Sequence, residues 1–155
     1  MSQLNKRDAE LSEAMGLQGR VPPFIELLGV IFEPTEGDGI CLKLAMREEL
    51  SLSHHGGALH GGVISALVDI IGGSVVAWKL KDEIKTLPLE EQAKRMSRVS
   101  TIDLRIDYLR PGKGKMFTAT GYILRYGKKV AVTRMELHNE EQVLIAAGAG
   151  SYTVG

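Results

Sequence analysis

The feature that most constrains the fold is an apolar run near the middle of the chain, residues 59–78, with the sequence LHGGVISALVDIIGGSVVAW. The run contains one acid, Asp69, and neither Lys nor Arg. Nothing after Gly62 forbids a helix, and at about 100° per residue the bulky apolar side chains gather on one face. The opposite face carries the acid among mostly small residues: Gly62, Ser65, Asp69, Gly72, Gly73 and Val76. A helix that is apolar on nearly every side is usually buried, so the run predicts a central helix.

The lone acid of this helix needs a physical reason, because burying an unpaired carboxylate is costly. The structural explanation is that the carboxylate of Asp69 is paired with another side chain. The functional explanation is that Asp69, on a face of small residues, is closely approached by a ligand or a second helix. The run is also about long enough to cross a bilayer, but its acid, glycines and serines argue against a membrane span.

Composition narrows the class of protein and of partner. The chain has 155 residues, enough for a single domain over 1–155 with a real core. Its 19 Lys and Arg balance 19 Asp and Glu, so nothing in the charge suggests a nucleic-acid partner. Cys41 is the only cysteine, which excludes an intramolecular disulfide and fits a reducing compartment. With no apolar signal core at the N-terminus, the sequence predicts a soluble cytoplasmic protein without membrane insertion.

The segments around the central run have distinct patterns. Residues 1–20 predict a short amphipathic helical extension, which Pro22 and Pro23 end. Residues 24–32 are dense in apolar side chains and predict a helical turn followed by a strand, and residues 40–46 alternate like a half-buried strand. After Trp78 comes a charged insertion, residues 79–98, in which 89–96 predict a short exposed helix.

From residue 101 onward the pattern changes to strict alternation of apolar and polar residues. Turn signals divide this part into four strands, predicted at 101–108, 116–125, 129–138 and 142–154. Because successive strands joined by short turns pair antiparallel, we expect a four-strand meander. The fold class is therefore α+β, with an antiparallel sheet beside one buried helix.

A sheet long enough to wrap around a single helix is the architecture called the hotdog fold, and one motif makes the resemblance specific. His60-Gly61-Gly62, followed by Leu67 and Asp69, resembles the HGG-x(4)-L-x-D signature of the PaaI-like acyl-CoA thioesterases. Residues 101–112 resemble the strand and turn that follow in the same family. The insertion at 79–98 and residues 136–142 resemble a proteobacterial subgroup that acts on medium- to long-chain acyl-CoA. The resemblance covers roughly residues 24–154.

The chemistry implied is hydrolysis of a thioester. Gly61 lies at the first turn of the predicted helix, where a free N–H and the positive end of the dipole can polarise a carbonyl oxygen. Asp69, eight positions later, lies about 12 Å further along the axis, so one helix cannot bring both to the same carbonyl. The resemblance implies a homodimer, or a homotetramer built as a dimer of dimers, in which Gly61 of one chain and Asp69 of another share a site. Asp69 then serves as general base or as nucleophile, and the sequence leaves both open.

Other site residues follow from the same resemblance. We expect His60 to hold the loop or contact the thioester, and Thr101 to hydrogen-bond water or Asp69. His54 stands where many relatives carry the Asn or Gln that orients water. The predicted contacts with substrate or coenzyme A come from Gly62, Ser65, Arg110, Arg125, Lys128 and Lys129.

Several rival interpretations remain at this point. The basic residues from Arg125 to Lys129 are more often a solvated hairpin tip than a phosphate clamp, and the spacing of His54, His55 and His60 is unlike that of a zinc site. We therefore predict no metal and no cofactor. The functional rivals are a non-catalytic acyl-CoA-binding module and a hotdog dehydratase or hydratase. A hotdog dehydratase or hydratase pairs an acid with a catalytic histidine in an order that is not found in this chain.

Overall fold

The computed structural model describes residues 21–36, 39–53 and 57–155. The helical extension predicted over 1–20 and the candidate His54 with its neighbour His55 lie outside these residues.

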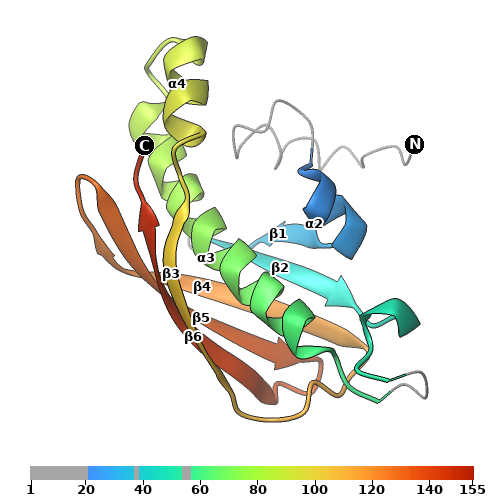
Figure 1. Ribbon diagram of the computed structural model, residues 1–155. Coiled ribbons are helices and arrows are strands. Elements are labelled where there is room, and N and C mark those ends of the chain that lie inside the picture. The colour runs from blue at the N-terminus through green and yellow to red at the C-terminus, as the bar shows by residue number, and fades with distance from the viewer. Residues whose placement is uncertain (1–20, 37–38, 54–56) are drawn as a thin grey trace.

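One antiparallel sheet of six strands wraps around a long helix, α3, as the hotdog architecture requires (Figure 1). In chain order the elements are α2 (Pro23–Leu28), β1 (Ile31–Pro34), β2 (Ile40–Ala45), a 3-10 turn (Glu48–Leu50), α3 (Gly61–Ile84), α4 (Leu89–Met96), β3 (Thr101–Tyr108), β4 (Met116–Tyr126), β5 (Val130–Asn139) and β6 (Leu144–Thr153). Each strand after residue 100 begins and ends within two residues of its predicted bounds.

The order of the strands corrects one prediction. The sheet runs β1-β2-β4-β5-β6-β3, so β4, β5 and β6 form a meander but β3 pairs with β6 at the far edge. The link from β3 to β4 has seven residues, 109–115, which is longer than a tight hairpin. It stays on β6 at first, since the N–H groups of Leu109 and Arg110 both donate to the carbonyl of Ile145. It then passes the start of α3, where Gly112 accepts a hydrogen bond from Leu59. The place beside β4 is taken by β2.

The predicted apolar face of the helix is the one that enters the core. Its buried members Ile64, Leu67, Ile71 and Val75 are each at most 8% exposed. On the opposite face, Gly62, Ser65, Asp69 and Gly73 keep some exposure, whereas Gly72 and Val76 are buried. They are covered because the sheet curls far enough round α3 for β5 and β6 to reach that side (Figure 1).

The helix continues six residues beyond Trp78 and ends at Ile84. Leu80 and Ile84 extend the four-residue apolar spacing and are buried, so the first part of the charged segment at 79–98 belongs to the core helix. The short exposed helix predicted in that segment is confirmed as α4, none of whose residues is buried.

By length and composition alone, α3 is long and apolar enough to cross a bilayer, with a mean hydropathy of 1.7 over 18 residues. In the fold, 44% of that window is buried. The helix packs on five strands of the sheet, as the core helix of a globular domain does.

Candidate active site

The N-terminus of α3 is held by the side chain of the residue before it. His60 is the N-cap, and its Nδ1 accepts a hydrogen bond from the N–H of Gly62 at 2.9 Å. The N–H groups of Val63 and Ile64 donate to the carbonyl of His60. Within residues 21–36, 39–53 and 57–155, the N–H of Gly61 has no acceptor. One donor at the positive end of the helix dipole is thus available to a ligand.

Gly61 is covered on one side by Tyr108, the last residue of β3. The Tyr108 hydroxyl donates to the carbonyl of Gly61 at 3.3 Å. A Cβ at position 61 would come no closer than 3.6 Å to the Tyr108 ring, which is an ordinary van der Waals contact. The described residues of one chain therefore leave room for a side chain at position 61.

The carboxylate of Asp69 is anchored by two hydroxyl groups from different strands. Thr101, the first residue of β3, donates through Oγ1 to Asp69 Oδ1 at 2.9 Å. Tyr152, near the end of β6, places its hydroxyl 3.3 Å from Oδ1 and 3.3 Å from the carbonyl oxygen of Asp69. Of the two predicted roles for Thr101, the structure shows the hydrogen bond to Asp69. Asp69 itself stays partly exposed.

A β-bulge aims Thr101 at the helix. Simple alternation puts Thr101 on the face of β3 opposite to Leu104, away from α3. The register between β3 and β6 shifts between Thr101 and Asp103, so that Thr101 pairs with Tyr152 while Asp103 pairs with Ser151. Such a bulge turns a side chain to the other face. It explains how Thr101 and Tyr152 reach the same carboxylate.

Sequence reasoning missed Tyr152. Its side chain is 1% exposed and lies between α3 and the sheet. Burial raises the pKa of its hydroxyl, and the negative charge of Asp69 adds to the effect, so the group is a neutral donor. A Cβ at Gly72 would overlap the Tyr152 hydroxyl, which explains a buried glycine in mid-helix. The available signal was in β6, where Tyr152 is the only bulky member of an inward-facing series of Ala and Gly.

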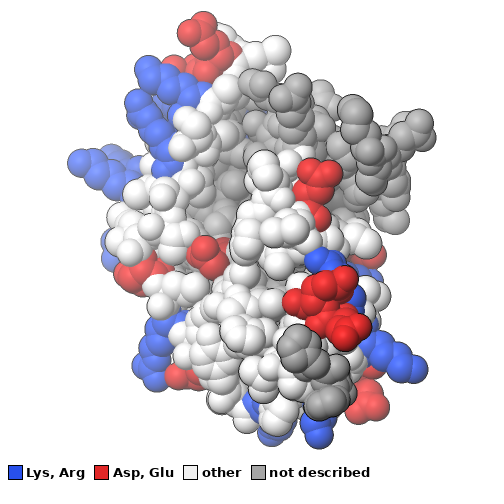
Figure 2. All heavy atoms as spheres, turned by 45° about the vertical axis from the view of Figure 1, so that its right-hand side comes forward, with Lys and Arg blue, Asp and Glu red and all other residues white. Residues whose placement is uncertain are grey.

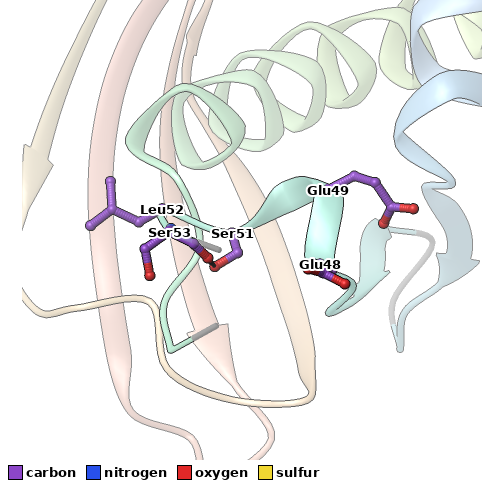
Figure 3. Close-up of a pocket in the computed structure, with 5 residues that line it drawn as sticks. All are labelled: Glu48, Glu49, Ser51, Leu52 and Ser53. Carbon is purple, nitrogen blue, oxygen red and sulfur yellow. Dashed lines mark hydrogen bonds between the residues drawn. The ribbon is translucent and has the colours of Figure 1, made fainter. Parts of the chain in front are cut away.

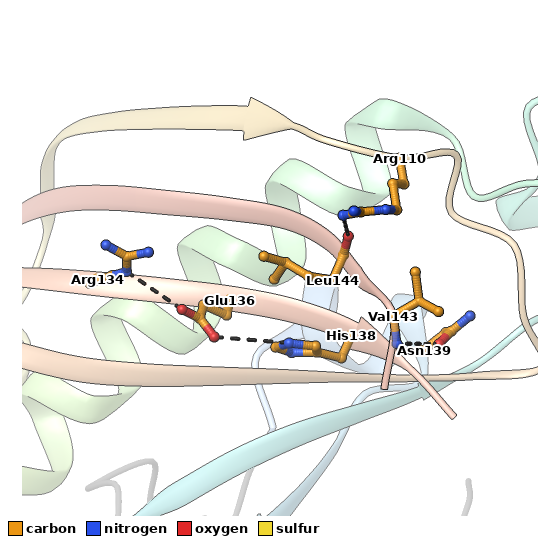
Figure 4. Close-up of polar contacts among 7 residues, drawn as sticks. All are labelled: Arg110, Arg134, Glu136, His138, Asn139, Val143 and Leu144. Atoms are coloured by element: carbon orange, nitrogen blue, oxygen red, sulfur yellow. Dashed lines mark hydrogen bonds and ion pairs between the residues drawn. The ribbon is translucent and has the colours of Figure 1, made fainter. Parts of the chain in front are cut away.

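The structure does not gather the predicted coenzyme A contacts in one place. Arg110 lies near the start of α3, and its guanidinium donates to the carbonyl of Leu144 at 3.0 Å (Figure 4). Arg125, Lys128 and Lys129 are exposed at the β4–β5 turn, at the other end of the sheet. Ser65 turns its hydroxyl back to the carbonyl of Gly62 at 3.0 Å.

The outer face of the sheet has a separate group of charges. On β5, Glu136 lies between Arg134, at 3.5 Å, and His138, at 3.9 Å (Figure 4). None of the predicted site residues belongs to this group. On the face seen in Figure 2, Lys and Arg side chains lie in several groups, and Asp and Glu side chains lie between these groups.

A surface hollow of about 440 Å³ lies beside the 3-10 turn (Figure 3). It is lined by Glu48, Glu49, Ser51, Leu52 and Ser53. Neither Gly61 nor Asp69 lines it, and its two carboxylates would repel the phosphates of coenzyme A. In the described part of the chain, no three His, Cys, Asp or Glu side chains are grouped so as to hold a metal ion. Gly61 and Asp69 are both partly exposed.

Comparison with known proteins gives consistent matches. Residues 56–146 match the thioesterase superfamily. The chain is 43% identical over 133 residues to the medium/long-chain acyl-CoA thioesterase YigI of Escherichia coli K12, covering 86% of each protein. A crystal structure of a Shewanella oneidensis protein related to the thioesterase superfamily aligns with a TM-score of 0.82 and 39% identity, over 94% of each chain. A Bacillus halodurans protein crystallised with CoA aligns with a TM-score of 0.68 over 99% of this chain and 97% of its own, and at 22% identity it supports the fold alone.

Proposed function

Since the chain belongs to the thioesterase superfamily and has its hotdog fold, we propose that it hydrolyses medium- to long-chain acyl-CoA to the free acid and CoA. The substrate class rests on the likeness to the E. coli enzyme YigI. We expect it to be cytoplasmic and to work as a homodimer or a dimer of dimers, without a metal or cofactor.

The proposed chemistry divides between the two halves of the site. The N–H of Gly61 donates to the thioester oxygen as negative charge develops there, a contribution of about 3–4 kcal/mol in comparable oxyanion holes. Asp69 acts at the carbonyl carbon. As a general base it takes a proton from water, the water oxygen bonds to carbon, the C–S bond breaks, and the proton passes to the sulfur of the leaving CoA. As a nucleophile its oxygen bonds to the carbonyl carbon while the C–S bond breaks and CoA leaves as the thiolate, and water then hydrolyses the acyl anhydride to the free acid and the Asp69 carboxylate.

The observation that carries the proposal is the separation of the two halves along one rigid helix. Eight residues of α3 place Gly61 and Asp69 about 12 Å apart, too far to contact one carbonyl group. A second chain solves this if two α3 helices lie antiparallel, so that Gly61 of each is opposite Asp69 of the other. The described residues of one chain provide no steric reason for glycine at position 61, and in this arrangement the reason is the approach of the substrate and the partner helix.

The surface next to α3 suits such a dimer. β3 is an edge strand, and beyond it the structure describes no further strand of this chain. Three large apolar side chains from this strand and the residue after it are exposed: Ile102 at 53%, Tyr108 at 55% and Leu109 at 47%. Exposed apolar side chains beside an unpaired strand edge are typical of an interface.

The test is complementation between two inactive variants. Asp69→Asn and Gly61→Ala chains carrying different tags are co-expressed, and the mixed dimers are measured by thiol release from acyl-CoA. Each variant alone should be inactive. A random mixture should recover about a quarter of wild-type turnover, because half of the dimers are mixed and one of the two sites in each is intact. Purified mixed dimers that stay inactive would contradict a site shared between chains.

A panel of acyl-CoA substrates from C4 to C18 tests the substrate class with the wild-type protein. We expect turnover to be highest for the medium and long chains. If the protein bound acyl-CoA and released no thiol from any of them, it would be a non-catalytic binding module instead.

A further inference from the structure

The two hydroxyl donors near Asp69 converge on the same oxygen. Thr101 donates to Oδ1 at 2.9 Å, and the Tyr152 hydroxyl lies 3.3 Å from Oδ1. In the part of the chain that the structure describes, no residue donates to Oδ2. The two oxygens of this carboxylate are therefore not equivalent: Oδ1 is held by two hydroxyl groups of the fold, and Oδ2 has no donor among the described residues.

The position of the Tyr152 hydroxyl is determined by close packing. Around the ring, three positions without a side chain form a slot. A Cβ at Gly72 would overlap the hydroxyl, one at Gly150 would lie 3.1 Å from the ring, and one at Gly73 would lie 3.5 Å from it. Val76 and Ala131 complete the surrounding cluster. Because buried side chains at this density have little freedom, the hydroxyl is held at one place on the helix.

We propose that Tyr152 is a positioning residue for catalysis, which together with Thr101 fixes Asp69 through Oδ1 and leaves Oδ2 to act on the thioester. The inference rests on the proposed function, in which Asp69 is the base or nucleophile. A hydroxyl that donates to a carboxylate stabilises its ionised form, which is the form that either role requires. It also reduces rotation of the carboxylate, so that Oδ2 meets the substrate in one orientation.

The decisive variant is Tyr152→Phe, which removes the hydroxyl and keeps the ring in its slot. Since each contact of the hydroxyl is long at 3.3 Å, we expect a moderate loss, with kcat lowered about three- to tenfold and KM little changed. Thr101→Val, which removes the shorter hydrogen bond, should lower kcat at least as far, again with KM little changed.

Tyr126→Phe is the matched control. The Tyr126 hydroxyl is also buried and packs in the same cluster, but the acid beside it is Glu83 and not Asp69. Its removal should leave kcat and KM unchanged.

The outcomes separate this inference from the proposed function. A Tyr152→Phe enzyme with wild-type kcat would overturn the positioning role, and so would a loss of turnover accompanied by an equal rise in KM, as a purely structural defect would cause. If Asp69→Asn abolishes hydrolysis in either of these cases, the proposed function survives and only the role of Tyr152 fails. If Asp69→Asn stays active, the proposed function fails and the inference fails with it.

Discussion

The two halves of the candidate site lie on the same helix but are built in different ways. At the start of α3, the backbone N–H of Gly61 has no acceptor among the described residues, which also leave room for a side chain there. In mid-helix, Asp69 is anchored by side chains from β3 and β6. The described part of one chain thus holds the acid through two hydroxyl groups and leaves the N–H donor without an acceptor. In our proposal, another molecule supplies the second half of each site.

Two glycines of α3 show the same contrast. Gly72 is required within the chain, because a Cβ there would overlap Tyr152. Gly61 is not required within the chain, since a Cβ there meets only an ordinary contact with Tyr108. The same residue type thus serves packing at one position and, in our proposal, ligand approach at the other. Substitutions at these positions should have opposite profiles of stability and activity.

The largest effect is expected from Asp69→Asn, which removes the proposed base or nucleophile and keeps its shape. The donors Thr101 and Tyr152 should hold the amide oxygen in the place of Oδ1, which leaves an NH₂ group where Oδ2 was. Hydrolysis should fall by about 10²–10⁴-fold, measured by thiol release, while acyl-CoA binding measured by calorimetry persists. Loss of binding together with turnover would instead indicate a structural role for Asp69.

Gly61→Ala should be next in effect on activity. A methyl group there would hold the thioester oxygen away from the N–H, and a misplacement of about 1 Å costs on the order of a hundredfold in rate. The free energy of unfolding, measured by urea titration, should be unchanged or slightly increased, because Ala favours a helix by up to about 1 kcal/mol over Gly. A strongly destabilised variant would show that the glycine serves the fold of the chain itself.

Gly72→Ala should have the opposite profile. Overpacking against Tyr152 should lower the free energy of unfolding by about 1–3 kcal/mol. Turnover should fall only as far as it does in Tyr152→Phe, because the hydroxyl is displaced from Asp69 while the acid remains. If Gly72→Ala were as stable as the wild type, the close contact with Tyr152 would be refuted.

The smallest effect on turnover is expected from Ser65→Cys. Ser65 is midway between Gly61 and Asp69 on α3, so in an antiparallel pair with two-fold symmetry it lies opposite its own copy. Mild oxidation should then join two chains through a disulfide, seen as a reducible dimer on a denaturing gel. Ala66→Cys, one position round the helix, is the control and should cross-link less. The native Cys41 is buried, and burial raises the pKa of its thiol, so it should not react. Equal cross-linking at both positions would argue against this arrangement of the helices.

Features that depend on neighbouring residues in the chain were predictable. The apolar period identified the central helix, and its continuation through Leu80 to Ile84 was missed because charged residues alternate with the apolar ones there. Alternation and turn residues located β3 to β6 closely. The motif of Gly61 and Asp69, with the rise of a helix, is also local, and the prediction of a site shared between two chains rests on it.

Features that depend on contacts between distant segments needed the structure. β3 lies at the edge because residues 109–115 carry the chain away from it and because β2 pairs with β4 in its place. Local sequence patterns describe neither of these. The bulge at Thr101 exists only in relation to β6. Tyr152 is 83 residues from Asp69 in the chain, and its small-residue slot comes from both α3 and β6. The sequence by itself determined which residues are available for chemistry, because periodicity and motif are local properties. Only the tertiary structure decided which oxygen of Asp69 is held, because that depends on two strands meeting one turn of the helix.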